Sequence, residues 1–439
     1  MKVLHCLNHF LPSQTAGTEI YTWALCKGLQ QQNVIAEVAI PNYGKNETTK
    51  YEYDGIKVYQ FAEPSVVDRA LQMGFKMPAG VPHFIKLITE LKPDIIHFHE
   101  LAGSNGFTLH YVKEAKLKGF KTIMTFHIAD YSCKAKTLMY KNAILCNGII
   151  DEYRCSECML SKGLSPAKRL PVLKIAKLLY KWNIDLSHFN SRIATALSYP
   201  FLIQKLKVDL LGLEKSCDKL VVLTTWYEKI LFDNGLRKEK ISIITQGLIH
   251  QLSGNDETVS KVDQVKLKLI FVGRISPFKG VHLILDALER FQAHEICLDV
   301  YGTGNEQYAK DCIGRMEQSE KVKYKNKLEP SSVVKKMMNY DALVLASTFS
   351  EMSPLVIQEA FAAGIPVIAS DVYGNAGQIE NGVNGWLFKF NDSDNLYKVL
   401  KFLVDNKQLI ALAKQQISPA RLFNEVVDEY KQIYSDLMN

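Results

Sequence analysis

The 439-residue sequence lacks the apolar runs that a membrane-spanning helix or a secretion signal requires. No uncharged apolar stretch reaches the length of about 18 residues that spans a bilayer. The N-terminal segment, Met1 to Leu7, runs directly into a strand-like pattern, without the longer apolar core and the small-residue cleavage site of a secretory signal. We therefore expect a cytoplasmic protein.

A large net charge is absent as well. Lys and Arg total 53 and Asp and Glu total 46, so the formal net charge is +7. This mild excess suits phosphorylated substrates or anionic lipid surfaces, and we expect no nucleic acid partner. Hydrophobic residues make up 47% and charged residues 23%, which are ordinary globular proportions and can fill two cores.

Nine cysteines, an odd number, do not form the disulfide framework typical of secreted proteins. Four of them cluster in one segment: Cys133, Cys146, Cys155 and Cys158. The spacing of Cys155 and Cys158 matches one half of a tetrahedral zinc site, whereas Cys133 and Cys146 are irregularly spaced. The sequence leaves three interpretations open, namely a structural zinc ion, free thiols, and disulfide or redox chemistry.

The alternation of short apolar runs with helical patterns predicts an α/β protein with two doubly wound domains. We expect an N-terminal domain over residues 1–250, with an insertion at about 131–213 that carries the cysteines. A polar segment at 251–266 predicts a linker, and a second domain follows over 267–415. The C-terminal helical segment, 416–439, is expected to pack back toward the N-terminal domain.

Strands are predicted where apolar residues run together: Lys2 to Leu7, Val34 to Ile40, Asp94 to His99, Thr122 to Phe126, Lys219 to Leu223, Leu267 to Val272, Ile296 to Tyr301, Ala342 to Ala346 and Pro366 to Ser370. Asp54-Gly55 predicts a hairpin turn. Ligands of doubly wound sheets bind just beyond the carboxyl ends of the strands. We therefore expect the chemistry in the loops at those ends, and in a cleft between the two domains.

The loop and helix that begin near Glu351 carry the strongest functional signal. Ser353 is predicted to cap a helix, with Pro354 as its first residue. The amides of Leu355 and Val356 are then unpaired at the helix start, where the helix dipole favours a phosphate. Glu351 in the preceding loop is placed to bind the hydroxyls of a sugar on one side of that phosphate.

Glu359 lies about one and a half turns inside the same helix, where it is placed to bind the vicinal hydroxyls of a ribose. The alternative is that Glu351 and Glu359 are solvated acids on an exposed surface. Ile357, Ala360 and Phe361 surround Glu359 in the sequence, and an acid in an apolar helix usually has a purpose.

The pair Glu351 and Glu359, with the continuation Glu-Ala-Phe-Ala-Ala-Gly-Ile-Pro-Val-Ile-Ala, resembles the E-x7-E motif of glycosyltransferase family 4. The resemblance implies the GT-B fold, in which two Rossmann-like domains face each other across a cleft. It also implies retaining stereochemistry, with the first Glu on the donor sugar and the second on the nucleotide ribose. No catalytic cofactor is implied beyond the nucleoside-diphosphate sugar, and the departing phosphate takes the proton of the acceptor.

Arg274 and Lys279 follow the first strand of the second domain, in the segment Phe271-Val-Gly-Arg-Ile-Ser-Pro-Phe-Lys-Gly280. Both are expected at the carboxyl end of the sheet, where fixed cations stabilise the charge of a departing diphosphate. The alternative is that they are ordinary surface charges. The segment resembles the Gly-Arg…Lys-Gly diphosphate motif of the family.

Three glycines are further candidates for donor binding. Gly302 and Gly304 resemble the Gly-x-Gly turn of the family, whose backbone is expected to approach the nucleotide base. Gly17 opens the first helix and lets the backbone approach a phosphate closely. The family usually has two glycines at this position and this chain has one, so the alternative for Gly17 is a role in starting the helix alone.

Histidines end two strands of the first domain. His97 and His99 point to one face because a strand has a period of two, and without a third ligand nearby we expect structural histidines rather than a metal site. Thr125-Phe-His127-Ile-Ala-Asp130 resembles the Thr-x-His-Asp segment of the family, which implies that His127 reaches the donor sugar. Two residues separate His127 from Asp130, so no role is carried over to Asp130.

The segment Ser165 to Lys181 predicts a basic amphipathic helix, in which Lys174, Lys177 and Lys181 recur at helical spacing beside apolar residues. Such a helix lies in the interface of an anionic membrane, or it packs on the N-terminal domain with its lysines in water. A peripheral contact with the inner face of the cell membrane would suit a lipid-linked acceptor.

Together these features predict a retaining hexosyltransferase that uses a nucleoside-diphosphate sugar and a glycan or lipid-linked acceptor in cell-surface polysaccharide assembly. A GT-B protein that binds nucleotide or glycan without catalysis is the main alternative. A dinucleotide-dependent oxidoreductase is disfavoured, because no G-x-G-x-x-G follows the first strand.

Overall fold

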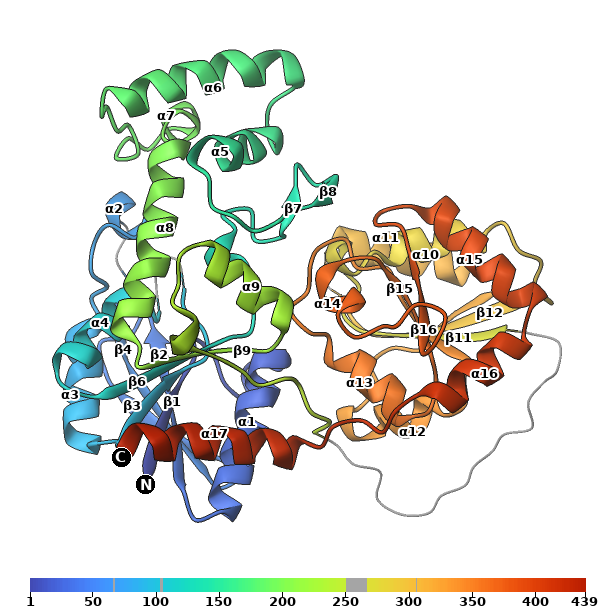
Figure 1. The fold of residues 1–439 in the computed structure, drawn as a ribbon, viewed down its shortest axis with the longest axis horizontal. Coiled ribbons are helices and arrows are strands. Elements are labelled where there is room, and N and C mark those ends of the chain that lie inside the picture. The colour runs from blue at the N-terminus through green and yellow to red at the C-terminus, as the bar shows by residue number, and fades with distance from the viewer. Residues whose placement is uncertain (66–67, 103–105, 250–266, 305) are drawn as a thin grey trace. The chain divides into compact units, whose positions relative to one another are not determined.

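The computed structural model describes residues 1–65, 68–102, 106–249, 267–304 and 306–439 (Figure 1). The chain divides into two compact units. Unit 1 consists of Met1–Lys141, Cys146–Thr245 and Phe423–Asn439, and unit 2 consists of Asn142–Leu145 and Gln246–Leu422. The linker expected at 251–266 lies outside the described residues.

Unit 1 contains an eight-stranded sheet in the order β10-β9-β6-β5-β1-β2-β4-β3. Its strands are β1 (Lys2–Cys6), β2 (Ile35–Tyr43), β3 (Thr49–Tyr53), β4 (Ile56–Glu63), β5 (Ile95–Phe98), β6 (Lys121–Phe126), β9 (Lys219–Val222) and β10 (Ile241–Ile243). Neighbouring strands are parallel, except that β3 is antiparallel to β4. Every residue of the central strand β5 is buried, as expected for a parallel sheet covered on both faces.

Asp54 and Gly55 join β3 to β4 with φ values of 49° and 75°. A two-residue hairpin turn of type I′ needs positive φ at both central residues. The predicted hairpin turn is therefore confirmed.

Helices cover the sheet of unit 1 and extend beyond it (Figure 1). They are α1 (Gly17–Gln31), α2 (Arg69–Gln72), α3 (Val81–Leu91), α4 (Leu109–Leu117), α5 (Glu152–Ser161), α6 (Pro166–Lys181), α7 (Arg192–Leu197), α8 (Tyr199–Ser216), α9 (Thr225–Asp233) and α17 (Phe423–Met438). The long helix α8 connects the sheet to α6 and α7, which lie away from it (Figure 1). A short hairpin of β7 (Met139–Tyr140) and β8 (Ile144–Leu145) precedes α5.

The C-terminal helix α17 belongs to unit 1 and packs against α1. Its buried tyrosines bond to the sheet, Tyr430 to Thr125 with an oxygen–oxygen distance of 2.9 Å and Tyr434 to His97 Nδ1 at 2.7 Å. Gly28 of α1 leaves the space that Val427 fills, because a Cβ at Gly28 would clash with that side chain.

Unit 2 contains a six-stranded parallel sheet in the order β13-β12-β11-β14-β15-β16. Its strands are β11 (Leu267–Val272), β12 (Ile296–Tyr301), β13 (Val322–Tyr324), β14 (Ala342–Leu345), β15 (Val367–Ser370) and β16 (Gly385–Phe388). Its helices are α10 (Val281–Leu288), α11 (Gln307–Glu317), α12 (Val333–Met337), α13 (Leu355–Ala362), α14 (Tyr373–Ala376), α15 (Ser393–Asp405) and α16 (Gln408–Gln416). Within the described residues, no helix combines the length and the apolar character that crossing a membrane requires.

Candidate functional site

Glu351 lies in the loop between β14 and α13, where two side chains hold its carboxylate. Ser347 Oγ donates a hydrogen bond to it at 2.5 Å, and Lys279 Nζ pairs with it at 2.6 Å. The side chains of Lys279 and Glu351 are only 23% and 12% exposed. The acid and one of the cations singled out in the sequence thus meet at the carboxyl edge of the unit 2 sheet.

Glycines allow the loops around Glu351 to approach one another. Gly280 has a φ of 62°, and a Cβ there would clash with the carbonyl oxygen of Ala346. Gly374 lies against the carbonyl oxygen of Glu351, where a Cβ would clash as well. A side chain at either position would therefore displace the loop that carries the acid.

Two buried polar residues support the same loop. Ser370 Oγ donates to the carbonyl of Ser347 at 2.8 Å, and Asn375 Nδ2 donates to the carbonyl of Ser370 at 3.1 Å. No pattern in the sequence pointed to Ser347, Ser370 or Asn375, because the bond from Ser370 to Ser347, which joins them, links loops 23 residues apart in the chain. Only the proximity of Ser347 to Glu351, four residues apart, could have suggested one of them.

Glu359 is half-buried in the second turn of α13 and differs from Glu351 in its surroundings. Desolvation by burial raises the pKa of its carboxyl to about 7. No charged or hydrogen-bonding partner contributes to this shift. The carboxyl is therefore available to a ligand, and a ligand that bonds to the carboxylate would stabilise its ionised form.

The helix α13 begins at Leu355, and Pro354 is its N-cap. The prediction that Ser353 caps the helix and Pro354 is its first residue was wrong by one position, because Pro354 has an extended ψ of 118°. Leu355 and Val356 still occupy the first turn, where backbone amides have no partner within the helix. Ser353 lies before the helix, so it does not cap it.

Arg274 is exposed at the turn after β11. A Cβ at Gly302 would clash with the carbonyl oxygen of Gly273, and one at Gly304 with that of Ile275. The Gly-x-Gly turn therefore packs directly on the backbone that carries Arg274. This packing alone requires the two glycines, whether or not their backbone also approaches a base.

In unit 1, three imidazoles form a hydrogen-bonded row at the carboxyl ends of the strands. His5 Nδ1 lies 2.9 Å from His99 Nε2, and His99 Nδ1 lies 3.1 Å from His127 Nε2. Burial lowers the pKa of His5 and of His127 to about 3, and lowers that of His99 as well. The row is therefore neutral at pH 7, and His99 fixes the orientation of the half-buried His127.

His97 stands beside this row, with its ring centroid 4.0 Å from that of His99. Its Nε2 lies 2.8 Å from Thr125 Oγ1, and its Nδ1 bonds to Tyr434. The expectation that no third ligand lies near His97 and His99 was wrong: in the described part of the chain, the ligand atoms of His5, His97 and His99 lie within 4.8 Å of one another, because β1 and β5 are neighbours in the sheet. Most of these nitrogens already have partners, which favours the predicted structural role over a metal site.

Gly17 and Asp130 of unit 1 differ in their burial. Gly17 is exposed at the start of α1, and a Cβ there would meet nothing within 4 Å. Packing within unit 1 therefore does not require glycine at this position. Asp130 pairs with Lys136 at 3.2 Å, and burial raises the pKa of its carboxyl.

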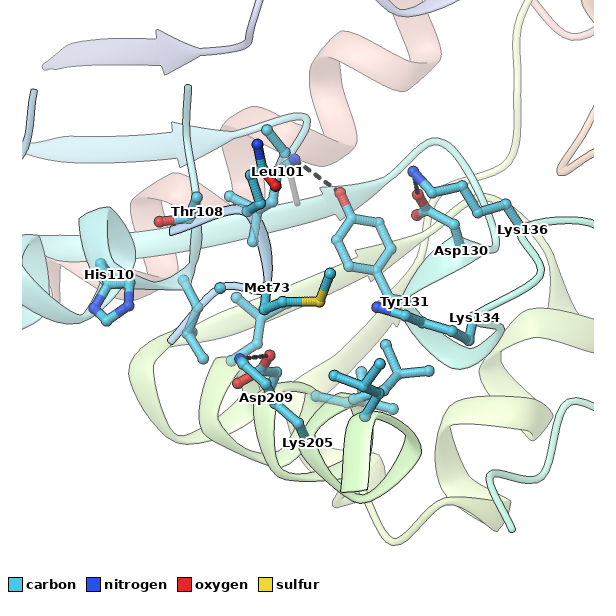
Figure 2. Close-up of a pocket in the computed structure, with 18 of the residues that line it drawn as sticks. Met73, Leu101, Thr108, His110, Asp130, Tyr131, Lys134, Lys136, Lys205 and Asp209 are labelled. Atoms are coloured by element: carbon cyan, nitrogen blue, oxygen red, sulfur yellow. Dashed lines mark hydrogen bonds and ion pairs between the residues drawn. The ribbon is translucent and has the colours of Figure 1, made fainter. Parts of the chain in front are cut away.

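A pocket of about 310 Å³ lies in unit 1 beside α8 (Figure 2). Six basic residues line it, namely Lys76, His110, Lys113, Lys134, Lys136 and Lys205. Its two acids are already paired, Asp130 with Lys136 and Asp209 with Lys205. Apolar side chains such as Met73 and Leu210 complete the walls. The pocket thus combines excess positive charge with apolar surface.

Comparison with known proteins identifies the class. The model of "Glycosyltransferase Family 4" matches residues 15–146, and the model of "Glycosyl transferases group 1" matches residues 255–422. The two matches together span more than half of the chain, which therefore belongs to the glycosyltransferases that these models describe.

The solved structures agree on the fold. The crystal structure of Anabaena HepE in complex with UDP and glucose superposes with a TM-score of 0.63, at 15% identity, over 99% of this chain and 100% of that one. At this identity the likeness shows the fold alone, and the fold is GT-B, as predicted.

Curated relatives match over shorter stretches. An uncharacterised glycosyltransferase of Methanocaldococcus jannaschii is 24% identical over 51% of this chain and 60% of its own length. A UDP-Gal:alpha-D-GlcNAc-diphosphoundecaprenol alpha-1,3-galactosyltransferase of Escherichia coli is 35% identical over 22% of this chain and 26% of its own length. The chain thus spans at most about 60% of the length of these two relatives.

Proposed function

We propose that this protein is a retaining glycosyltransferase that transfers a hexose-type sugar from a nucleoside-diphosphate sugar to a glycan or lipid-linked acceptor in the assembly of a cell-surface polysaccharide. The observation that carries the proposal is the charged group at the start of α13, where Glu351 and Lys279 meet at 2.6 Å. The names of relatives, such as the E. coli galactosyltransferase and a colanic acid biosynthesis glycosyltransferase of Salmonella typhimurium, support this class of acceptor.

In this proposal the donor binds along the carboxyl edge of unit 2. The diphosphate takes positive charge from Arg274 and Lys279 and hydrogen bonds from the amides of Leu355 and Val356. Glu359 binds the ribose hydroxyls. In the free protein Lys279 is paired with Glu351, so donor binding exchanges this carboxylate for a phosphate oxygen at Lys279.

Glu351 then faces the sugar that is transferred. As the glycosidic bond breaks, the sugar ring gains positive charge and the diphosphate gains negative charge. A carboxylate near the ring and fixed cations near the leaving group stabilise this separation more in the transition state than in the ground state. The departing phosphate takes the proton of the acceptor hydroxyl, and the two cations supply the charge that a catalytic metal ion would supply.

Unit 1 is proposed to bind the acceptor, and its His127 is proposed to contact the donor sugar. The basic and apolar pocket of Figure 2 suits an acceptor that carries phosphate next to an apolar group. The backbone at Gly17 leaves open space for a ligand. A catalytically inactive GT-B binding protein remains the alternative.

We also propose that α6 lies on an anionic membrane. Large apolar side chains are exposed along α6 and the segment that follows it, among them Leu170 (59%), Trp182 (64%), Phe189 (62%) and Ile193 (73%). Lys174, Lys177 and Lys181 are exposed on the same helix. Exposed apolar residues interleaved with lysines are typical of an interfacial helix, whereas a helix with merely solvated lysines would not expose so many apolar side chains.

A thermal-shift screen over nucleotide sugars, followed by a transfer assay with the stabilising donor, tests the function. A donor that binds raises the melting temperature by mass action, and an enzyme also hydrolyses or transfers its sugar. Stabilisation by several donors without any turnover would favour the binding protein.

Liposome sedimentation tests the membrane contact. Binding should need acidic lipid, weaken with salt, and fall by about 1 kcal/mol for each of the three lysines changed to Glu. Trp182→Ser should weaken it too, whereas the matched control Leu412→Ser, equally apolar and 54% exposed on α16, should not. Binding that ignores the lysines, or that falls equally in the control, would contradict the proposal.

A further inference from the structure

Four cysteines of unit 1 gather around a single small cavity. Cys133 follows a short turn of 3-10 helix, Cys146 follows β8 directly, and Cys155 and Cys158 lie one turn apart on α5. All four line the same cavity of about 20 Å³. We refer to Cys133, Cys146, Cys155 and Cys158 as the cysteine cluster. A space of this size holds one water molecule or one metal ion.

A backbone donor and two cationic side chains lie near the sulfurs. The backbone amide of Lys141 donates a hydrogen bond to Cys158 Sγ at 3.2 Å. Lys134 and Arg154 line the same cavity as the four sulfurs. Four thiolates around one divalent cation carry a net charge of −2, and these neighbouring cations would offset it.

The backbone between Cys133 and Cys146 lacks the means to hold its own shape. The strands β7 and β8 contain only two residues each, and an isolated two-stranded hairpin is marginal in water. Four non-glycine residues of this segment have positive φ, namely Lys136, Leu138, Lys141 and Asn142. Such conformations cost about 1 kcal/mol or more each and persist only where the surroundings enforce them. A crosslink between the flanking cysteines would supply that enforcement.

We propose that the cysteine cluster binds one zinc ion through four thiolates. Each thiol releases its proton to solvent as its sulfur–zinc bond forms, and nothing is oxidised or reduced. In the part of the chain that the structure describes, no three of these sulfurs lie within 4.8 Å of one another. A tetrahedral site with bonds of about 2.3 Å brings the sulfurs to about 3.8 Å, so the cluster contracts around the ion.

The zinc ion would also fix one wall of the pocket in Figure 2, because Cys133 and Lys134 line both cavities. Zinc would therefore affect the acceptor pocket without touching the donor residues of unit 2. The site does not depend on the proposed transferase activity, since it is defined by metal content.

Elemental analysis of the full chain, purified without chelator, tests the site. We expect about one zinc per chain in the wild type and in the control Cys297→Ser, whose thiol lies on β12. The variants Cys155→Ser and Cys146→Ser should lose the metal. A strong thiol-directed chelator should lower the melting temperature of the wild type, and added zinc should restore it.

Cobalt(II) provides a measurement that does not depend on how well the variants fold. Cobalt exchanged into the wild-type chain should give the intense sulfur-to-metal charge-transfer band of a tetrahedral thiolate site. Less than about a tenth of an equivalent of zinc, with all four thiols titratable in the native protein, would overturn the proposal. A disulfide between any two of these cysteines in the intact mass would overturn it as well.

Discussion

The two units place different chemistry at the carboxyl ends of their sheets. Unit 2 presents ionic groups, with Glu351 paired to Lys279, Arg274 exposed, and Glu359 without a partner that shifts its pKa. Unit 1 presents the neutral row of His5, His99 and His127, whose pKa values burial lowers far below 7. Charged groups suit a diphosphate, whereas neutral donors and acceptors suit sugar hydroxyls. The contrast supports the proposal that the nucleotide binds to unit 2.

The largest effect is expected at the cations of unit 2. Arg274→Ala and Lys279→Ala should each lower kcat by about 10² to 10³ and weaken nucleoside diphosphate binding, because both are proposed to contact the leaving group. Only Lys279→Ala should also lower the melting temperature, since it leaves the largely buried Glu351 without its ion pair. Steady-state kinetics measures kcat, calorimetry measures nucleoside diphosphate affinity, and thermal melts measure the melting temperature. Unchanged turnover in both variants would remove the cations from the donor site.

A smaller effect, a change of about tenfold in nucleoside diphosphate affinity, is expected as Glu359 ionises with rising pH. Its pKa is about 7 in the free protein, so the carboxylate, which is proposed to bind the ribose, is only partly formed at pH 6. Nucleoside diphosphate affinity should therefore rise between pH 6 and pH 8. Glu359→Gln should bind more weakly and lose this rise, and calorimetry at three pH values checks both.

The same pKa shift predicts that Glu359→Gln, which weakens nucleotide binding, makes the folded protein more stable at high pH. A carboxyl whose pKa is higher in the folded state stabilises the fold below its unfolded value, near 4.5, and loses that contribution as the pH rises through about 7. Glu359→Gln should therefore be more stable than the wild type at pH 8 by roughly 1–3 kcal/mol, and the difference should shrink toward pH 5. A difference independent of pH would contradict the buried, unpaired state of Glu359.

The smallest effect is expected in unit 1. His99→Ala removes the hydrogen bond that orients His127 and should lower kcat about tenfold, without changing nucleoside diphosphate affinity. Because the row is neutral at pH 7, the pH profile of wild-type kcat should show no histidine titration between pH 6 and pH 8. His294→Ala, at an exposed position of unit 2, serves as the control. Loss of nucleotide affinity in His99→Ala would contradict the proposal that unit 2 alone binds the nucleotide.

Much of the fold follows from the sequence, because continuous apolar runs specify buried parallel strands. Leu267–Val272 and Ile296–Tyr301 form strands with the predicted bounds. The strands β10 and β13 were not predicted, since three residues give too little pattern. The strand β16 was missed as well, and it begins at a glycine, which is uncommon in strands. The predicted helix start was wrong by one residue, because proline is compatible both with the N-cap and with the first turn of a helix.

The candidate site was predictable only where residues adjacent in the chain act together. Glu351 and Glu359 flank one helix start, so their spacing carries the signal. The pairing of Glu351 with Lys279, 72 residues away, arises from the order of β11 and β14 in the sheet. The same holds for His5 on β1 and His99 just after the neighbouring strand β5, which lie 94 residues apart in the chain. Spacing along the chain contains no information on such contacts.

The most direct test of the donor site compares Glu351→Gln with Glu359→Gln by calorimetry of nucleoside diphosphate binding and by steady-state kinetics. Glu359→Gln should weaken binding of donor and nucleoside diphosphate alike, because the ribose does not change during the reaction. Glu351→Gln should cut kcat while nucleoside diphosphate affinity stays unchanged or improves, because Lys279 loses a competing partner. Loss of nucleoside diphosphate binding in Glu351→Gln, with binding intact in Glu359→Gln, would contradict the account.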